Sequence, residues 1–300
     1  MSIGLLLGLA AALCWGSTDV AAAFSGRRLG SLRVAALVQL SSLAAVLVVC
    51  VVRSSGLPAK PEDTLAALIN GVVAAGAYIA FFTALRIGPV SVVSPVVAAY
   101  GGLTVVLAVL IRGETLTPLQ ALGAAIGTIG VILTGLISDG GWRQTRIVGR
   151  GVVFSLIAMA CFAILTIGLA GPIRSAGWLP VMLGSRAANA ATVWLVLGLV
   201  LAMRAPATAP LLAPAADRRA VGLRVAIAVG LIGGLLDIVG FVAFAIGLEQ
   251  APTWIVGLAS SFGPVVTVLV AVVLWGERLR ANQWLGLAGI AAGLVAVALP

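Results

Sequence analysis

Residues 80–136 read AFFTALRIGPVSVVSPVVAAYGGLTVVLAVLIRGETLTPLQALGAAIGTIGVILTGL, and the same pattern returns later in the chain. Residues 243–299 read AFAIGLEQAPTWIVGLASSFGPVVTVLVAVVLWGERLRANQWLGLAGIAAGLVAVAL, and 18 of the 57 aligned positions are identical without a gap. Composition alone would give about six identities, so the two stretches indicate an internal repeat. The identities include residues that punctuate helices: Pro89 with Pro252, Gly113-Glu114 with Gly276-Glu277, and Gln120 with Gln283.

The composition requires a lipid environment. Of the 300 residues, 62% are hydrophobic and 9% are charged, and the mean hydropathy is +1.21. Soluble domains carry about 25% charged residues, so this chain cannot cover a globular surface with polar groups. The net charge of +9 would suggest nucleic acid in a soluble protein. Here cationic loops beside lipid headgroups explain it better, and no nucleic-acid partner is expected.

Ten apolar segments can be placed along the chain. Each is long enough, or nearly so, to span about 30 Å of hydrocarbon. Spanning segments must satisfy their own backbone polar groups, which favours helices, and the short alternating segments of a β-barrel are absent. The sequence therefore predicts an all-α integral membrane protein with ten transmembrane helices, at residues 3–24, 31–52, 64–85, 89–111, 117–137, 150–171, 178–202, 222–247, 252–274 and 282–299.

The repeat divides the chain into two five-helix halves. We expect repeats at residues 1–137 and 150–300, joined by a loop at 138–149. The early helices of the halves also match at an offset of 147, since Gly4, Cys14, Arg27 and Gly30 align with Gly151, Cys161, Arg174 and Gly177. Five is an odd number, so the second copy must enter the membrane in the opposite sense. Inverted repeats are typical of secondary transporters, whose substrate site lies near the midplane between the halves.

Three charged residues lie within the expected spans. Asp237 is near the middle of span eight, Arg186 is within span seven, and Asp19 is toward the far end of span one. Intramembrane charges are costly and usually functional, so these could couple protons or act as substrate counter-ions. The alternative is a buried Asp–Arg pair that only locks two helices. Gln39, which aligns with Arg186, and Asn189 are further polar candidates.

Aromatic residues inside or near the ends of spans could stack on a substrate ring. Interfacial aromatic belts are the alternative explanation, particularly for tryptophan. A substrate cavity between the halves would be lined by spans one, three, four, six, eight and nine. The aromatic candidates for it are Trp15, Tyr78, Tyr100, Trp254 and Phe262.

Two prolines predict breaks at near-matching places in the halves. Pro95 lies inside span four and Pro264 inside span nine. Proline removes a backbone donor and kinks a helix, which frees carbonyls that a ligand could use, although a kink can also serve packing alone. At equivalent helix ends, Glu114 and Glu277 each follow a glycine. We expect the glycine to end one helix and the glutamate to lie near the N-terminus of the next.

Several chemistries are excluded by what the chain lacks. There is no histidine, which removes histidine proton relays and the common Ser–His designs and makes a bound transition metal unexpected. No Gly-x-x-x-x-Gly-Lys-Ser/Thr motif occurs, so ATP is not the expected energy source. The chain is therefore expected to be neither an enzyme nor a holder of a cofactor or metal.

Three short motifs in the sequence resemble those of a known family. Trp15-Gly16-Ser17 in span one, with GETL (113–116) and GERL (276–279) after spans four and nine, resembles the drug/metabolite transporter superfamily and its EamA branch of ten-helix bacterial exporters. The resemblance implies a secondary exporter of small metabolites, amino acids and aromatic ones among them, that works by alternating access and is often driven by protons. Arg186 matches an arginine this family often carries in its second and seventh helices, whereas the first copy has Gln39.

The sequence thus predicts a multi-pass exporter of small amphipathic metabolites in the bacterial inner membrane, with Asp237 or Asp19 coupling protons if protons are used. A passive uniporter or channel, or multidrug efflux, remains an alternative. The expected partners are a small-molecule substrate, the bilayer and, for a coupled transporter, protons, and the chain could act as a monomer. The resemblance implies cytoplasmic termini, whereas the arginine-rich odd-numbered loops place the termini outside, so the orientation stays open.

Overall fold

The computed structural model describes residues 3–87, 93, 96–135, 150–203, 212, 222–263, 265–266 and 281–299, and this part of the chain contains helices and no strand. The helices are α1 (Ile3–Leu29), α2 (Ser31–Val52), α3 (Pro61–Ile87), α5 (Tyr100–Arg112), α6 (Pro118–Gly135), α7 (Arg150–Ala176), α8 (Trp178–Met203), α10 (Leu223–Gln250), α11 (Thr253–Ser260) and α13 (Ala281–Ala298).

Most of these helices are suited to a bilayer. By length and composition, α1, α2, α3, α7, α8 and α10 could each cross a membrane, and shorter apolar helices cover Val96–Arg112, Pro118–Leu133 and Trp284–Ala298. Large apolar side chains face outward along them, with Val51 79% exposed and Leu110 75% exposed. Such a surface is unfavourable in water and favourable against lipid tails, which agrees with an integral membrane fold.

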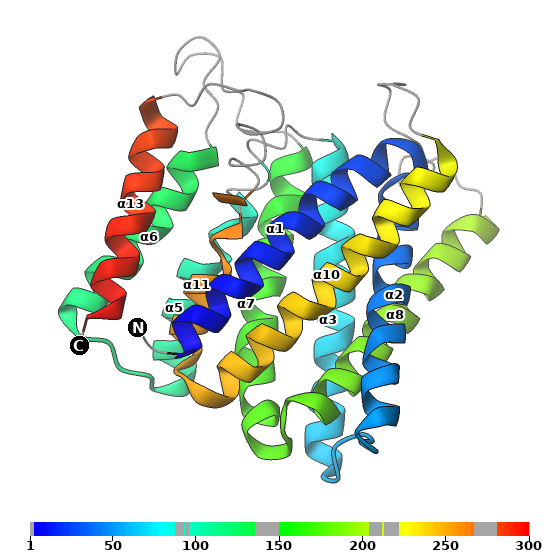
Figure 1. Ribbon diagram of the computed structural model, residues 1–300, viewed down its shortest axis with the longest axis horizontal. Helices are drawn as coiled ribbons and strands as arrows, with labels where there is room; N and C mark the ends of the chain where they lie inside the picture. Colours follow the sequence, from blue (N-terminus) through cyan, green and yellow to red (C-terminus); the bar gives the residue numbers. More distant parts are fainter. Residues whose placement is uncertain are drawn as a thin grey trace.

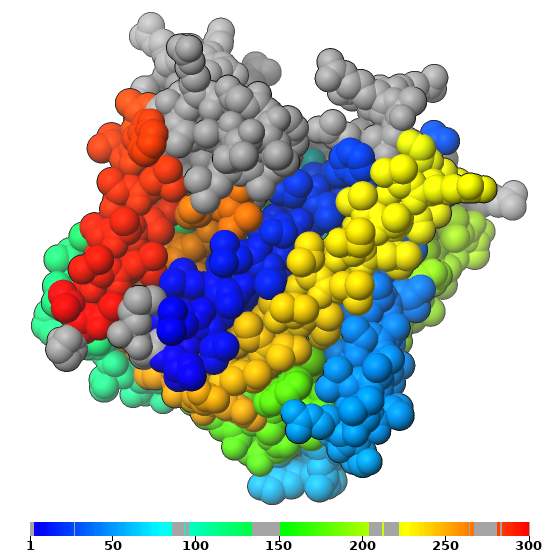
Figure 2. Space-filling model, viewed as in Figure 1, coloured from blue at the N-terminus to red at the C-terminus, as the bar shows by residue number. Residues whose placement is uncertain are grey.

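The packing of the helices has two-fold symmetry. Helix α1 packs along α10, and its counterpart α7 packs along α3. The helices α2 and α8, α5 and α11, and α6 and α13 each pack against their own counterparts. Figure 1 shows α1 rising from the N-terminus while α10 descends beside it, and Figure 2 shows the two crossing one face together. The two five-helix halves are therefore inverted repeats related by an axis between them.

The first turn of each repeat is built on the same glycine. Gly30 ends α1 with φ 84°, and Gly177 ends α7 with φ 83°. The two positions align at the offset of 147, and each amide donates to the carbonyl four residues earlier, Gly26 at 3.0 Å and Ile173 at 2.9 Å. A positive φ is costly for residues with a Cβ, so glycine is the residue that allows these sharp turns.

Helices α6 and α13 contact each other through glycines. A Cβ on Gly123 would lie 2.9 Å from the Gly293 oxygen, and a Cβ on Gly130 would lie 2.7 Å from the Gly286 oxygen. Gly123 aligns with Gly286, and Gly130 aligns with Gly293. The two glycine contacts are therefore symmetry copies of each other. This is the self-complementary packing of a two-fold interface, with backbones close enough that only glycine fits.

Spans four and nine are both interrupted at equivalent places. A turn interrupts the first at Ala99, and the second leaves the α-helix at Ser261 and Phe262, where Ala99 and Phe262 align at the offset of 163. The Phe262 amide donates to the Ala259 carbonyl at 3.3 Å, a tighter three-residue hydrogen bond. Pro95 and Pro264, the predicted causes of the breaks, lie outside the described residues.

The expected capping role of Glu114 needs a correction. Gly113 ends α5 with φ +65°, as predicted. The next helix, α6, is instead capped by Thr117 and Gln120, each of whose side chains accepts the other's backbone N–H. Glu114 reaches the other repeat, where its Oε2 accepts the Trp254 backbone N–H at 3.1 Å, at the start of α11. The carboxylate of Glu114 therefore accepts from an unsatisfied backbone N–H at the start of a helix in the other repeat, not at the start of the helix that follows it in the chain. Glu277 lies outside the described residues.

Arg174 completes this contact between repeats. It donates to the carbonyls of Leu248 at 3.0 Å and Ala251 at 2.9 Å, and its Nη2 lies 3.7 Å from Glu114 Oε1. Glu114, Arg174 and the backbone N–H of Trp254 together form what we call the terminal-face clasp. It joins the α5–α6 loop, the end of α7 and the α10–α11 turn on the face where both chain ends lie (Figure 1).

Candidate functional site

A cavity lies between the two repeats. It contains about 740 Å³ of empty space, including the part that opens to solvent. Its walls come from spans one, three, four, six, eight and nine, the set expected from the sequence. The lining residues are Trp15, Thr18, Asp19, Tyr78, Phe81, Val97, Ala98, Tyr100, Phe162, Leu165, Thr166, Asp237, Phe241, Phe244, Ser260, Ser261 and Gly263.

The lining itself repeats the internal symmetry. At the two offsets, 147 for the early helices and 163 for the later ones, all but one of the described lining residues align with another lining residue. The exception is Asp237, whose counterpart Ala74 does not line the cavity. Each wall is therefore the counterpart of the facing wall. The aligned pairs are Trp15 with Phe162, Thr18 with Leu165, Asp19 with Thr166, Tyr78 with Phe241, Phe81 with Phe244, Val97 with Ser260, Ala98 with Ser261 and Tyr100 with Gly263.

Aromatic rings form much of the wall. Both tyrosines of the chain line the cavity, although aromatic residues make up only 6% of the sequence. The rings contact one another, with centroids 5.3 Å apart for Trp15 and Phe244 and 5.6 Å apart for Tyr78 and Phe162. These edge and tilted contacts are favourable aromatic geometries, and they hold the rings in place around the empty space.

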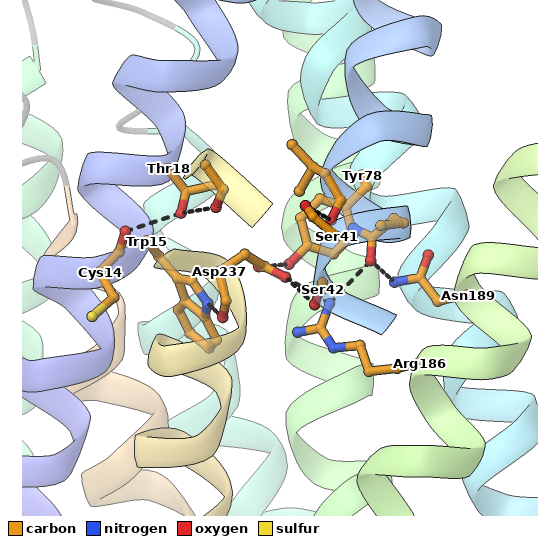
Figure 3. A network of polar contacts seen from close by, with 12 residues as sticks. Cys14, Trp15, Thr18, Ser41, Ser42, Tyr78, Arg186, Asn189 and Asp237 are labelled. Carbon is orange, nitrogen blue, oxygen red and sulfur yellow. Dashed lines mark hydrogen bonds and ion pairs between the residues drawn. The ribbon is translucent and has the colours of Figure 1, made fainter. Parts of the chain in front are cut away.

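Asp237 accepts three side-chain contacts at the wall of the cavity (Figure 3). Its side chain is fully buried, and Oδ2 lies 2.8 Å from Nη1 of Arg186. The Tyr78 hydroxyl donates to Oδ1 at 2.5 Å, and the Ser42 hydroxyl donates to Oδ2 at 3.2 Å. A buried carboxylate with a counter-ion and further donors avoids most of the cost of an unpaired charge.

Arg186 extends this arrangement away from the cavity. Its Nη1 also donates to Gln39 Oε1 at 3.1 Å, which accepts a further hydrogen bond from Asn189 at 3.0 Å. The guanidinium carbon lies 4.0 Å from the centre of the Phe241 ring, a cation–π contact. We call Gln39, Ser42, Tyr78, Arg186, Asn189 and Asp237 the central network; it joins α2 and α3 of one repeat to α8 and α10 of the other.

The central network keeps unused hydrogen-bonding capacity. Nε and Nη2 of Arg186, Nε2 of Gln39 and Oδ1 of Asn189 are buried and have no hydrogen-bond partner among the described residues. Buried polar groups are normally paired, so these atoms mark a place where the network can accept a further polar group.

Asp19 differs from Asp237 in its surroundings. It lines the cavity from α1 and is partly exposed to it. Within the described part of the chain it takes part in no hydrogen bond or ion pair. Of the two carboxylates in the lining, Asp237 is held by its protein partners, and Asp19 has none among the described residues.

The other predicted site residues divide into three groups. Trp15 and Tyr100 line the cavity; the Trp15 ring N–H donates to the Asp237 carbonyl at 3.3 Å, and the Tyr100 hydroxyl lies 2.8 Å from Ser260 Oγ. Gln39, Arg186 and Asn189 lie behind Asp237, outside the lining. Trp254 and Phe262 are buried in helix packing and do not line the cavity.

Some residues of the site were missed, although the repeat pointed to them. Phe162 aligns with the predicted Trp15, and Phe241 aligns with the predicted Tyr78. Ser42, which binds Asp237, aligns with the predicted Asn189. Adding the aligned counterpart of each candidate in the other repeat would have identified all three residues. No cluster of residues that could hold a metal ion occurs in the described part of the chain.

Two inverted five-helix repeats enclosing a cavity lined by both define the scaffold of a multi-pass membrane transporter. The chain belongs to the EamA-like transporter family, whose family model matches residues 2–136 and 149–299, one match for each repeat. This family lies in the drug/metabolite transporter superfamily and comprises transporters, not enzymes. The repeat boundaries expected at 137 and 150 stay a prediction, since residues 136–149 lie outside the described residues.

Comparison with solved structures agrees on the fold. One, described only as the crystal structure of a protein, superposes with a TM-score of 0.76 at 19% sequence identity. The superposition covers 98% of this chain and 96% of that one. No curated protein matches the chain significantly.

Proposed function

We propose that this chain exports small amphipathic metabolites across the bacterial inner membrane by alternating access, with the cavity between the repeats as the substrate site. The observation that carries the proposal is the paired lining of the cavity. Because aligned residues of two inverted repeats line the same cavity, rocking one half against the other presents nearly the same wall to either side of the membrane.

The terminal-face clasp supports the alternating part of this proposal. Glu114 and Arg174 join the two repeats only on the face that holds the chain ends. Opening the cavity toward that face requires these contacts to break. Ion pairs and hydrogen bonds of this kind contribute only about 1–3 kcal/mol, which is small enough for a reversible gate.

For proton coupling, Asp19 is the better candidate. Protonating Asp237 would leave Arg186 as an uncompensated buried charge, at a cost of about 3–5 kcal/mol. Among the described residues Asp19 has no hydrogen-bond or ion-pair partner to lose, so its proton can exchange without disrupting the central network. The sequence left this choice between the two carboxylates open, and the surroundings of each favour Asp19.

Amino acids with an aromatic side chain match the aromatic character of the lining. Their carboxylate would need a cation, and Arg186, with Nε and Nη2 unpaired, is the candidate nearest the cavity. A passive uniporter or channel uses the same scaffold without coupling. The two are separated by counterflow, because a carrier accelerates labelled-solute uptake when unlabelled solute is on the other side, whereas a channel does not.

The test uses purified protein in proteoliposomes and a panel of amines, amino acids and other small metabolites. Counterflow of at least one solute is expected, together with its loss in Ala98→Phe, which fills the cavity. Leu195→Phe is the matched control, because Leu195 is 62% exposed on the lipid-facing surface. Equal flux in both variants would remove the cavity from the mechanism, and equal uptake with and without a pH gradient would remove proton coupling.

A further inference from the structure

We propose that the cavity selects small organic cations, such as protonated amines with an aromatic or apolar body, over zwitterions and anions, with Asp19 as the counter-ion. This inference rests on the proposed function, because it names the substrate class of the same site. It comes from three features of the described lining: its charge, the isolation of Asp19 and the geometry of the rings.

The first feature is the balance of acidic and basic residues in the described lining. Asp19 and Asp237 are its ionisable acids, and the described lining contains neither lysine nor arginine. Arg186 offsets Asp237 from behind, with 2.8 Å between Nη1 and Oδ2. The Asp19 carboxyl therefore has no basic partner among the described residues. A solute that brings a single positive charge completes the balance, and a solute that brings a carboxylate worsens it.

The isolation of Asp19 is asymmetric between the repeats. Its counterpart in the second repeat is Thr166, whose hydroxyl is satisfied by the Phe162 carbonyl at 2.9 Å. The charge is therefore not part of the repeated scaffold but an addition to one wall. A carboxylate facing a low-dielectric cavity is costly without a partner, and this chain offers none from the described residues. A bound cation would supply that partner.

The rings favour the same charge. Cations are attracted to the faces of aromatic rings, most strongly to tryptophan. The site already shows such a contact, because the Arg186 guanidinium lies 4.0 Å from the centre of the Phe241 ring. On the same wall as Asp19, four residues earlier on α1, Trp15 lines the cavity, and its aligned residue Phe162 lines it from the other repeat. An ammonium group at Asp19 would thus have aromatic neighbours, and the apolar body would occupy the remaining wall.

The cavity would bind a zwitterion more weakly than a cation. Its carboxylate would have to reach Arg186, which is 2% exposed and lies behind Asp237, outside the lining. The nearest groups in the cavity are the carboxylate of Asp237 and the hydroxyl of Tyr78, which is already donated to Asp237. Amino acids would therefore bind more weakly than the corresponding amines.

Four probes that each carry a phenyl ring on a short chain separate these cases: 2-phenylethylamine as cation, phenylalanine as zwitterion, 3-phenylpropionate as anion and 2-phenylethanol as neutral solute. Each is titrated calorimetrically into protein in lipid nanodiscs and then tested by counterflow. The amine is expected to bind about tenfold more tightly than the alcohol, with phenylalanine and phenylpropionate weaker still.

The variant Asp19→Asn keeps the shape of the side chain and removes its charge. It should lower amine affinity about tenfold and leave affinity for the alcohol unchanged. Asp63→Asn is the matched control, because Asp63 accepts a hydrogen bond from Ser175 outside the cavity. A folded Asp19→Asn variant, with a wild-type melting temperature, that keeps the amine preference would overturn the inference.

The outcomes also separate this inference from the proposed function. Counterflow of phenylalanine or the alcohol as fast as the amine leaves a transporter but overturns cation selectivity. Cation selectivity is also overturned, and the transporter kept, if none of the four probes binds or is transported while an unrelated anionic metabolite is transported. Absence of any carrier flux across the whole panel overturns both.

Discussion

Arg186 donates a hydrogen bond to its own counterpart, since Nη1 lies 3.1 Å from Oε1 of Gln39, which occupies the aligned position 147 residues earlier. Equivalent points of two repeats meet only on the axis that relates them, so this contact marks the axis. The two residues differ there, and the difference breaks the symmetry. Arginine in one repeat provides a charge that Asp237 balances, whereas the other repeat has glutamine and, at the position of Asp237, Ala74.

The first prediction concerns this ion pair. Arg186→Gln restores the residue of the other repeat but leaves Asp237 buried without a counter-ion, which should destabilise the fold by about 3–5 kcal/mol. Asp237→Asn should be similarly harmful because it leaves the guanidinium unpaired. The double variant should be about 2 kcal/mol less destabilised than the sum of the two.

Thermal unfolding in detergent, followed by tryptophan fluorescence, measures this cycle. Strict additivity of the two changes would mean that the pair does not interact energetically, in contradiction of the 2.8 Å contact. Asp63→Asn, far from the network, is a suitable acid-to-amide control.

A second prediction separates the two tyrosines of the cavity. Tyr78→Phe removes a hydroxyl that donates to a carboxylate at 2.5 Å, and hydrogen bonds to charged groups contribute about 1.5–3 kcal/mol. Tyr100→Phe removes one that contacts the neutral Ser260 at 2.8 Å, where about 1 kcal/mol is expected. The melting temperature should therefore fall further in Tyr78→Phe. An equal or reversed order would show that Asp237 does not depend on Tyr78.

The third prediction tests the glycine contact of α6 and α13. Gly293→Ala places a Cβ 2.7 Å from the Gly123 oxygen and 2.8 Å from the Gly127 backbone, neither of which can rotate away. Separating the helices should cost about 1–3 kcal/mol. Gly76→Ala in α3 is the control, since its Cβ would meet nothing within 4 Å, and it should be neutral or slightly stabilising. A melting temperature for Gly293→Ala as high as that of the control would refute close packing of α6 and α13.

The fourth prediction concerns the terminal-face clasp. Glu114→Ala removes the acceptor of the Trp254 N–H and the partner of Arg174, which should favour the state open toward the face with the termini by about tenfold. Ser261→Cys, in a background without the three native cysteines, reports access to the cavity. Its labelling by a membrane-impermeant thiol reagent from that face should become faster by a similar factor.

The control for the clasp is Glu62→Ala, because Glu62 lies exposed in the first turn of α3. Right-side-out and inside-out vesicles, with an N-terminal tag to mark the face, separate the two sides and also establish the orientation of the chain. Faster labelling from the opposite face only would show that the clasp does not gate access to the cavity.

Much of the site was predictable because inverted repeats constrain it twice. Trp15, Tyr78, Tyr100, Asp19 and Asp237 were candidates from the sequence, and all line the cavity. Their aligned residues complete the walls. Trp254 looked equally suitable by position, but an aromatic residue in a helix can face the cavity or the packing, and only the rotation of α11 decided that it is buried.

The sequence by itself determined the scaffold, because lipid permits few ways to bury backbone polar groups and a repeat of five spans must invert. It also aligned Gly30 with Gly177, and the structure places both at sharp turns with positive φ, a conformation that glycine adopts at low cost. The tertiary structure alone decided which carboxylate has protein partners in the described part of the chain. Asp19 and Asp237 are the same residue type in similar apolar runs, and their roles differ because Arg186, Tyr78 and Ser42 converge from other helices on one of them.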